Sequence, residues 1–301
     1  SGFLCVTQQT IRRCLKMKQR LLTAVVGISL GIAVLCLNNT IIFPIFVAFV
    51  AVMSVYEVLN VCGCKKYPVH FGMCLLFAAV IPMLTWFPQI GMIWRIFAAS
   101  VIVFFMFAGY VADHKKLPFD KLAVMVTVTC LATLSITCLV SLKNMSTVHG
   151  ICYVVMALMA AWIPDAGAYF VGTACGKHKL CPDISPKKTV EGAVGGLVVT
   201  AVVFVLYGMG YKYVMHTFKG IDFDVNYPAL GVIMLIAAVI SMVGDLSASL
   251  LKREYNIKDY GKILPGHGGV VDRFDSVYFV LPYIMLVFNA FGQKIFIHSV
   301  S

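Results

Sequence analysis

Charged side chains are scarce in this 301-residue chain and make up only 12% of it. Soluble domains carry about twice that share. Hydrophobic residues reach 60%, and the mean hydropathy is +0.91. A soluble globule of this size could not hide so much apolar surface, and disordered chains need the opposite composition. The class that remains is a helical protein embedded in a bilayer.

Long polar stretches are also missing, which leaves no room for a separate soluble domain. A membrane-spanning helix needs about 20 apolar residues. We therefore predict an all-α, polytopic membrane protein with about nine spanning helices. The apolar runs place them at Leu21–Leu37, Thr40–Val61, His70–Phe87, Ile90–Val111, Leu122–Leu142, Thr147–Thr173, Val190–Val214, Leu230–Leu251 and Val277–Ala290.

The expected domain is a single membrane-embedded unit over residues 17–301, with its catalytic part at about 160–280. Met17 opens a stretch typical of a bacterial start, so we expect residues 1–16 to be upstream or disordered sequence. Metal or redox cysteine motifs are missing. Of the eleven cysteines the one close pair, Cys62 and Cys64, is too tight for a CxxC site, which predicts buried or reduced thiols.

Acidic residues are few as well, 13 against 24 Lys and Arg, which gives a net charge of +11. If the N-terminus is cytoplasmic, most of these cations fall in cytoplasmic loops, which favours an N-in, C-out topology. The basic residues come in small groups between apolar runs, so a lipid bilayer is the expected partner and no nucleic acid is expected. A bacterial plasma (inner) membrane, with the active site facing the cytoplasm, is the predicted location.

Apart from Glu191 and Lys212, which lie near the two ends of the seventh run, four charges fall inside the predicted spans. Asp165 and Asp245 are expected near the cytoplasmic ends of their helices, at a depth where an ionised group is costly. Such groups usually face a polar cavity and a partner. The alternative is an aspartate that bonds to a neighbouring helix or reaches the membrane interface. Glu57 and Arg95 are expected close to the membrane surface, where snorkelling explains them.

One cluster of motifs follows the sixth predicted helix. Gly172 and Gly176 share a helix face with Asp165, where small residues permit close approach of a helix or a ligand. Thr189 is a plausible N-cap for the next helix. Lys187 and Lys188 then stand beside the positive end of that helix, which suits an anionic phosphate. An ordinary positive flank of a membrane helix is the alternative.

A second cluster begins in the eighth helix. Asp245, Ser249 and Lys252 are spaced i, i+4, i+7, so they form one polar stripe on an otherwise apolar helix. The stripe rises from a buried carboxylate to a cationic surface group. Membrane packing does not require such a gradient, which indicates a functional site.

A glycine-rich turn, Pro265-Gly-His-Gly-Gly269, comes next. Glycines allow backbone N–H groups to approach a phosphate, although no Walker A pattern is present. Asp272 and Asp275 follow at i, i+3, and carboxylates near phosphates suit Mg²⁺. His267 is a candidate acid, base or phosphate donor. Together these parts predict phosphoryl or nucleotidyl transfer on the cytoplasmic side.

The stretch from Ser249 to Asp275 resembles the signature of the phosphatidate cytidylyltransferase (CDP-diacylglycerol synthase) family. It reads SLLKR, then KDYG, then LPGHGGVVDRFD. The segment SPKKTVEG from Ser185 is similar to a second characteristic stretch of that family, and the likeness extends from Met17 to the C-terminus. The resemblance implies the reaction of CTP with phosphatidic acid to give CDP-diacylglycerol and pyrophosphate in phospholipid biosynthesis. It also implies Mg²⁺, with room for a second cation such as K⁺, and a homodimer.

The resemblance also assigns roles to residues of this sequence. The expected catalytic residues are Asp245, Asp272, Lys252, Arg253 and His267. The expected metal ligands are Asp245, Asp272 and Asp275. The expected substrate-binding residues are Ser249, Lys258, Asp259, Lys187, Lys188, Ser185, Gly268, Gly269, Arg273 and Asp165. The stretch Gly172-Thr-Ala-Cys-Gly176 departs from the expected Gly-Arg-x-Phe-Gly, which removes one candidate phosphate contact.

Three other classes compete with this interpretation. A CTP-dependent lipid-alcohol kinase would attack the γ-phosphorus, and the complete signature argues against it. A CDP-alcohol phosphotransferase lacks support because its DGxxAR…GxxxDxxxD pattern is absent. A transporter or cation channel with Asp165 and Asp245 as coupling sites would not need the patterned loop after the eighth helix.

Overall fold

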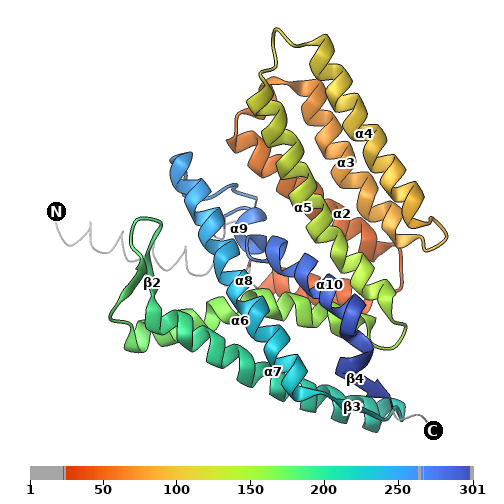
Figure 1. The fold of residues 1–301 in the computed structure, drawn as a ribbon, viewed down its shortest axis with the longest axis vertical. Helices are drawn as coiled ribbons and strands as arrows, with labels where there is room; N and C mark the ends of the chain where they lie inside the picture. The colour runs from red at the N-terminus through yellow and green to blue at the C-terminus, as the bar shows by residue number, and fades with distance from the viewer. Residues whose placement is uncertain (1–22, 24, 264–265, 267, 299–301) are drawn as a thin grey trace, which may run out of the picture. The chain divides into compact units, whose positions relative to one another are not determined.

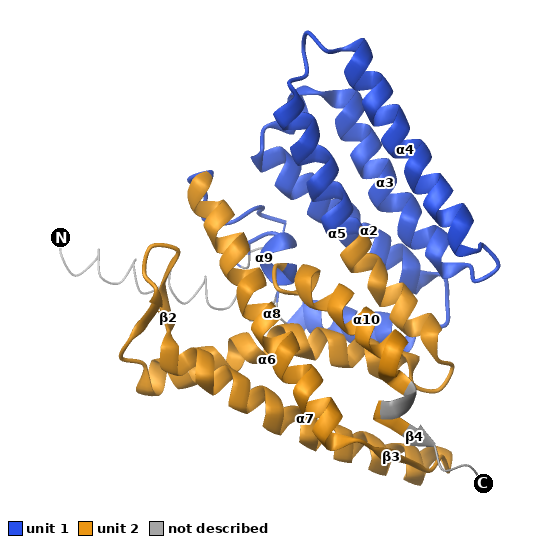
Figure 2. Cartoon of the chain, in the orientation of Figure 1, with its two compact units in different colours: residues 1–133, 255–274 blue, residues 134–254, 275–301 orange. Residues whose placement is uncertain are grey.

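The computed structural model describes residue 23, residues 25–263, residue 266 and residues 268–298, which are almost entirely helical (Figure 1). These residues belong to two compact units (Figure 2). Unit 1 comprises residues 1–133 and 255–274, and unit 2 comprises residues 134–254 and 275–301. The prediction of an all-α protein is confirmed.

Seven helices of the described residues are long and apolar enough to cross a membrane. They are α2 (Ile42–Val61), α3 (Pro68–Trp86), α4 (Met92–Ala112), α5 (Phe119–Met145), α6 (Gly150–Cys175), α7 (Val190–Lys219) and α8 (Tyr227–Glu254). Shorter apolar helices cover Val25–Cys36 and most of α10 (Val277–Ile295). All nine predicted helices therefore have a counterpart, and the polytopic membrane character is confirmed. Nine complete spans and the N-in orientation remain predictions.

Unit 1 is built on α2, which packs against α3, and α3 packs in turn against α4. Val47, Ala51 and Val55 recur every four residues along α2 and are almost completely buried, so one face of this helix forms the core of the unit. A short 3-10 helix, η1 (Cys64–Lys66), follows α2. The four-residue helix α9 (Val271–Phe274) also packs against α2.

Unit 2 is built on α6, which packs against α7, α8 and α10. Small side chains allow this close packing. Ala157, Ala160 and Ala161 of α6 are fully buried. A methyl group added to Gly196 of α7 would lie 2.6 Å from the backbone oxygen of Pro164 in α6. Glycine on α7 therefore lets the two helix backbones touch.

One short antiparallel hairpin and one antiparallel pair of distant strands complete unit 2. Strand β1 (Lys179–Cys181) pairs with β2 (Ser185–Thr189), and β3 (Phe223–Val225) pairs with β4 (Phe296–His298). Sequence reasoning missed these strands, because segments of three to five residues are too short to show an alternating pattern. The β1–β2 hairpin leads directly into α7 and thereby places Lys187 and Lys188 at the start of that helix.

Candidate active site

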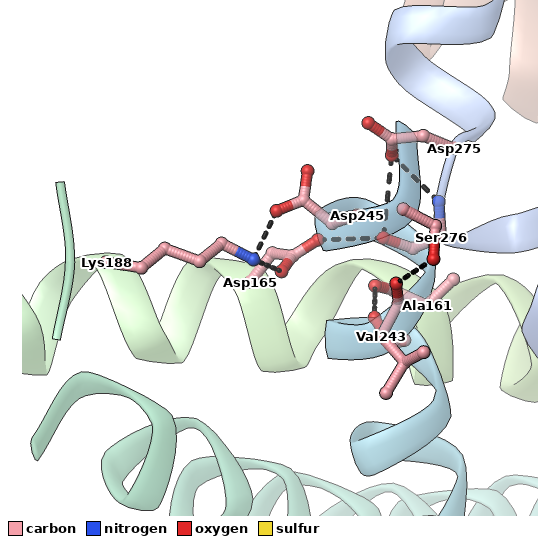
Figure 3. Close-up of polar contacts among 9 residues, drawn as sticks. Ala161, Asp165, Lys188, Val243, Asp245, Asp275 and Ser276 are labelled. Carbon is pink, nitrogen blue, oxygen red and sulfur yellow. Dashed lines mark hydrogen bonds and ion pairs between the residues drawn. The ribbon is translucent and has the colours of Figure 1, made fainter. Parts of the chain in front are cut away.

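Helices α6 and α8 bring Asp165 and Asp245 to one place in unit 2. The hydroxyl of Ser241 in α8 donates to the backbone oxygen of Ala161 in α6 at 2.7 Å. This bond lies one turn before Asp245 on α8 and one turn before Asp165 on α6, so it sets both aspartates at the same level. Figure 3 shows their carboxylates facing each other.

The side chain of Lys188 reaches between these two carboxylates (Figure 3). Its ammonium nitrogen lies 3.7 Å from Oδ1 of Asp165 and forms an ion pair with Oδ2 of Asp245. The three side chains are only 21–33% exposed. Lys188 is thus the partner expected for each membrane aspartate, whereas the polar cavity expected beside them stays a prediction. The first and second sequence motifs meet at this cluster.

Thr189, as the first residue before α7, fixes the position of the neighbouring Lys188. Its side chain accepts a hydrogen bond from the backbone N–H of Gly192 at 3.1 Å, which confirms the predicted N-cap of α7. Thr189 also fills the space beside Gly172 and Gly176, where added methyl groups would meet it. These glycines therefore let Thr189 and the start of α7 approach α6, which supports the helix-packing interpretation of their spacing.

Ser276 and Asp275 close the other side of the cluster. Oγ of Ser276 donates to Oδ2 of Asp165 at 3.1 Å, and the backbone N–H of Ser276 donates to Oδ1 of Asp275 at 2.8 Å. Ser276 is 1% exposed, and sequence reasoning missed it because a single serine after the signature carries no distinctive spacing. Burial and the negative charge of Asp245 raise the pKa of the Asp275 carboxyl, and the charge of Lys252 opposes that rise.

The donor set of unit 2 fits a hard divalent cation. Among the described residues no three acidic, His or Cys side chains already converge as a metal cluster. The ammonium of Lys188 nevertheless occupies the space between two carboxylates, so this pair accepts a positive charge. Carboxylate oxygens are the ligands that Mg²⁺ prefers.

The remaining expected residues of unit 2 border this cluster. Ser249 and Lys252 follow Asp245 along one face of α8 and are half-buried. Arg253 donates from Nε to the backbone oxygen of Ile184 at 3.4 Å, so the end of α8 contacts the β1–β2 hairpin. Ser185 and the exposed Lys187 lie on β2 of that hairpin.

Unit 1 carries the rest of the signature. Oδ2 of Asp272 accepts hydrogen bonds from the backbone N–H groups of Tyr260 and Gly269, both at 2.9 Å. Gly266 and Gly268 have φ values of +78° and +89°, which confirms the predicted need for glycine in this turn. Lys258, Asp259 and Arg273 are exposed. The expected acid–base residue His267 lies outside the described residues.

Glu57 corrects the expectation drawn from its sequence position. Instead of reaching the membrane surface it is 2% exposed. Its carboxylate accepts hydrogen bonds from the backbone N–H groups of Val270 and Val271 at 3.1 and 2.9 Å. The donors come from a segment more than 200 residues later, so no local pattern could have predicted this contact.

Comparison with known proteins covers the candidate residues of both units. The model of the cytidylyltransferase family matches residues 18–291. The chain belongs to the cytidylyltransferase family. It is 31% identical over 278 residues to a phosphatidate cytidylyltransferase of Bacillus subtilis (strain 168), covering 92% of this chain and 99% of that relative. A phosphatidate cytidylyltransferase of Staphylococcus haemolyticus (strain JCSC1435) is 34% identical over 275 residues, covering 90% and 98%.

A third relative, the phosphatidate cytidylyltransferase of Staphylococcus aureus (strain COL), is 33% identical over 273 residues. The resemblance seen in the signature is therefore confirmed over nearly the whole chain. As a member of the cytidylyltransferase family, the chain is a nucleotidyltransferase. The Asp165–Lys188–Asp245 cluster and the Asp272 loop both lie within the matched residues.

Proposed function

We propose that this chain catalyses the reaction of CTP with phosphatidic acid to give CDP-diacylglycerol and pyrophosphate, as a step of phospholipid biosynthesis. The observation that carries the proposal is the 31–34% identity to relatives named phosphatidate cytidylyltransferase over at least 90% of the chain. The partly buried carboxylates beside a lysine-bearing hairpin support it, because nucleotidyl transfer needs cations around phosphates.

The proposed metal is Mg²⁺, with a second cation such as K⁺ compatible with the acidic surroundings. In unit 2 the proposed ligands are Asp245 and Asp275, and in unit 1 the proposed ligand is Asp272. When bound, the metal would act as a Lewis acid that neutralises phosphate charge and polarises the α-phosphorus.

The basic residues of unit 2 would hold the phosphates. Lys188 is balanced by Asp165 and Asp245, and metal binding at Asp245 would release its ammonium for a phosphate oxygen. Lys187, Lys252 and Arg253 add charge, and Ser185 and Ser249 add hydroxyl donors. In unit 1 the proposed nucleotide- and phosphate-binding residues are Lys258, Asp259, Gly268, Gly269 and Arg273, with His267 as a donor to phosphate.

The chemical step requires little proton transfer. An oxyanion of the phosphatidate phosphate attacks the α-phosphorus of CTP, and the bond from that phosphorus to the bridging oxygen of the β-phosphate breaks. The electron pair leaves with pyrophosphate, whose charge the lysines offset. Because the nucleophile is already ionised, no general base is required.

The distribution of positive charge is the basis for the proposed membrane location and orientation. The positive charge of the loops supports a site that faces the cytoplasm at a bacterial plasma membrane, where CTP would be available and phosphatidic acid would arrive laterally from the bilayer. A homodimer is the proposed assembly.

Purified protein with phosphatidic acid, Mg²⁺ and CTP labelled on both the α- and γ-phosphates tests the proposal. Label from the α-position should appear in the lipid, with γ-label in pyrophosphate. Label from the γ-position in the lipid would identify a kinase. No lipid product from monodisperse protein would overturn the enzymatic assignment and favour transport.

A further inference from the structure

Glu57 is a buried carboxylate that the proposed chemistry does not use. It lies in α2 of unit 1, and both of its oxygens are engaged by backbone N–H groups. Oε1 accepts from Val270 and Oε2 accepts from Val271. These donors immediately precede Asp272, the aspartate that the family resemblance assigns to the metal.

The loop is shaped to enclose this carboxylate. A methyl group added to Gly261 would overlap Oε1 of Glu57, and one added to Gly269 would lie 2.6 Å from the same oxygen and closer still to Oε2. Neither glycine has a positive φ, so the backbone conformation does not require glycine at either position. The close approach of the Glu57 carboxylate is what requires glycine at both positions.

Two carboxylates therefore bind three successive backbone N–H groups. Gly269 donates to Asp272, and Val270 and Val271 donate to Glu57. Asp272 also receives the N–H of Tyr260, at the other end of the loop. Because the loop backbone is bound to α2 at the residues next to Asp272, the position of that side chain depends on Glu57.

We propose that Glu57 is a positioning residue for cytidylyl transfer, which holds residues 269–271 so that Asp272 is presented to the nucleotide-bound metal. The inference rests on the proposed function, since Asp272 receives its role from it. Partners that orient metal ligands are usually needed for full activity, because a ligand displaced by a fraction of an ångström loses its geometry.

Glu57→Gln is the direct test, because it keeps the size of the side chain and replaces one acceptor with a donor that faces an N–H group. We expect kcat to fall about 10- to 100-fold and the Mg²⁺ concentration for half-maximal rate to rise, with the KM for phosphatidic acid unchanged. Asp120→Asn is the matched control, since Asp120 is an exposed acid of the same unit. An unchanged kcat and Mg²⁺ dependence in Glu57→Gln would overturn the inference.

Hydrogen exchange of the metal-free protein gives a readout that is independent of activity. Peptides covering residues 268–274 should exchange faster in Glu57→Gln than in the wild type, while peptides from α3 and α4 should not change. Unchanged exchange at residues 268–274 would also overturn the inference, even if activity falls. If the wild type makes no CDP-diacylglycerol, the proposed function fails, and the exchange result still decides whether Glu57 holds the loop.

Gly261→Ala supplies a second variant in case Glu57→Gln does not fold. Its methyl group would displace the Glu57 carboxylate, so the same loss of kcat is expected. In a Glu57→Ala background the overlap is absent, and Gly261→Ala should then change kcat by less than about twofold. Gly72→Ala is the control, because a methyl group there meets nothing within 4 Å. Equal losses in both backgrounds would contradict the proposed contact.

Discussion

Lys188 determines the charge balance among the residues of the site in unit 2. Two carboxylates that are only partly exposed repel each other, and each would be costly without a nearby cation. The ammonium of Lys188 contacts both Asp165 and Asp245, which stabilises the ionised pair. Under the proposed function, Mg²⁺ would bind these carboxylates when the ammonium binds a phosphate instead.

Asp245→Asn tests the importance of this carboxylate. The variant should fold and enter membranes but lose at least about 3 kcal/mol of transition-state stabilisation, which is about a hundredfold in turnover. The matched control is Asp224→Asn, because Asp224 pairs with Lys212 at 2.5 Å on the exposed surface of the same unit. Production of CDP-diacylglycerol is the measurement, and near-normal turnover in Asp245→Asn would contradict the metal assignment.

The Asp275 carboxyl should make the stability of the folded protein depend on pH. Its raised pKa means that the folded protein binds this proton more tightly than the unfolded chain does. The stabilising contribution is therefore complete below the unfolded pKa of about 4 and is lost as the pH rises through the raised folded value. In chelator, the thermal midpoint of the wild type should fall more steeply between about pH 5 and pH 8 than that of Asp275→Asn. Parallel curves for the two proteins would refute this.

Single residues could be predicted from the sequence where placing their charge in an apolar helix carries a high free-energy cost. A carboxylate inside an apolar run is expensive, so Asp165 and Asp245 stood out. Glu57 stood out for the same reason but its role did not, and Ser276 was missed, because both residues act through contacts with distant segments. Glu57 was misread as a residue that reaches the membrane surface, since nothing near it in sequence indicates that residues 270 and 271 cover it.

At the scale of elements, the contact of α6 with α7 positions the candidate residues of unit 2. Glycines on α7 touch the backbone of α6, so the hairpin between these helices starts and ends at fixed points. Lys188 reaches the two aspartates because Thr189 begins α7 directly beside α6. Substitution of these glycines should therefore change the free energy of unfolding, and that change measures the helix contact.

Gly196→Ala tests this helix contact. The added methyl group would lie 2.6 Å from the backbone oxygen of Pro164, which cannot move aside cheaply, so we expect a loss of about 1–3 kcal/mol in the free energy of unfolding. Gly210→Ala on the same helix meets nothing within 4 Å and should be neutral or stabilising by up to about 1 kcal/mol. Unfolding in detergent compares the two, and equal midpoints would refute the close packing.

Helices were predictable because apolar runs of spanning length are long and distinct. The nine runs all correspond to helices, and the N-cap of α7 followed from Thr189 before the run. The β1–β2 hairpin and the β3–β4 strand pair were not predictable, because their strands are only three to five residues long and their pairing depends on tertiary context. The β1–β2 hairpin matters for the site, since it carries Ser185, Lys187 and Lys188.

At the scale of the whole molecule, the distribution of positive charge predicts an orientation. In a variant without native cysteines, Asp222→Cys in the loop before α8 should react with an impermeant maleimide added to intact cells. Lys179→Cys in the β1–β2 hairpin should react only after the membrane is permeabilised, because its loop is rich in lysine and is expected inside. The reverse labelling pattern would place the site on the opposite side.

The central claim is that a phosphate oxygen of the lipid attacks the α-phosphorus of CTP, and oxygen isotopes test it most directly. Phosphatidic acid labelled with ¹⁸O in its phosphate is incubated with the protein, unlabelled CTP and Mg²⁺. The masses of both products are then measured by mass spectrometry. The account predicts that all of the ¹⁸O stays in CDP-diacylglycerol and that the pyrophosphate carries none. Heavy oxygen in the inorganic product, or a lipid product without cytidine, would contradict it.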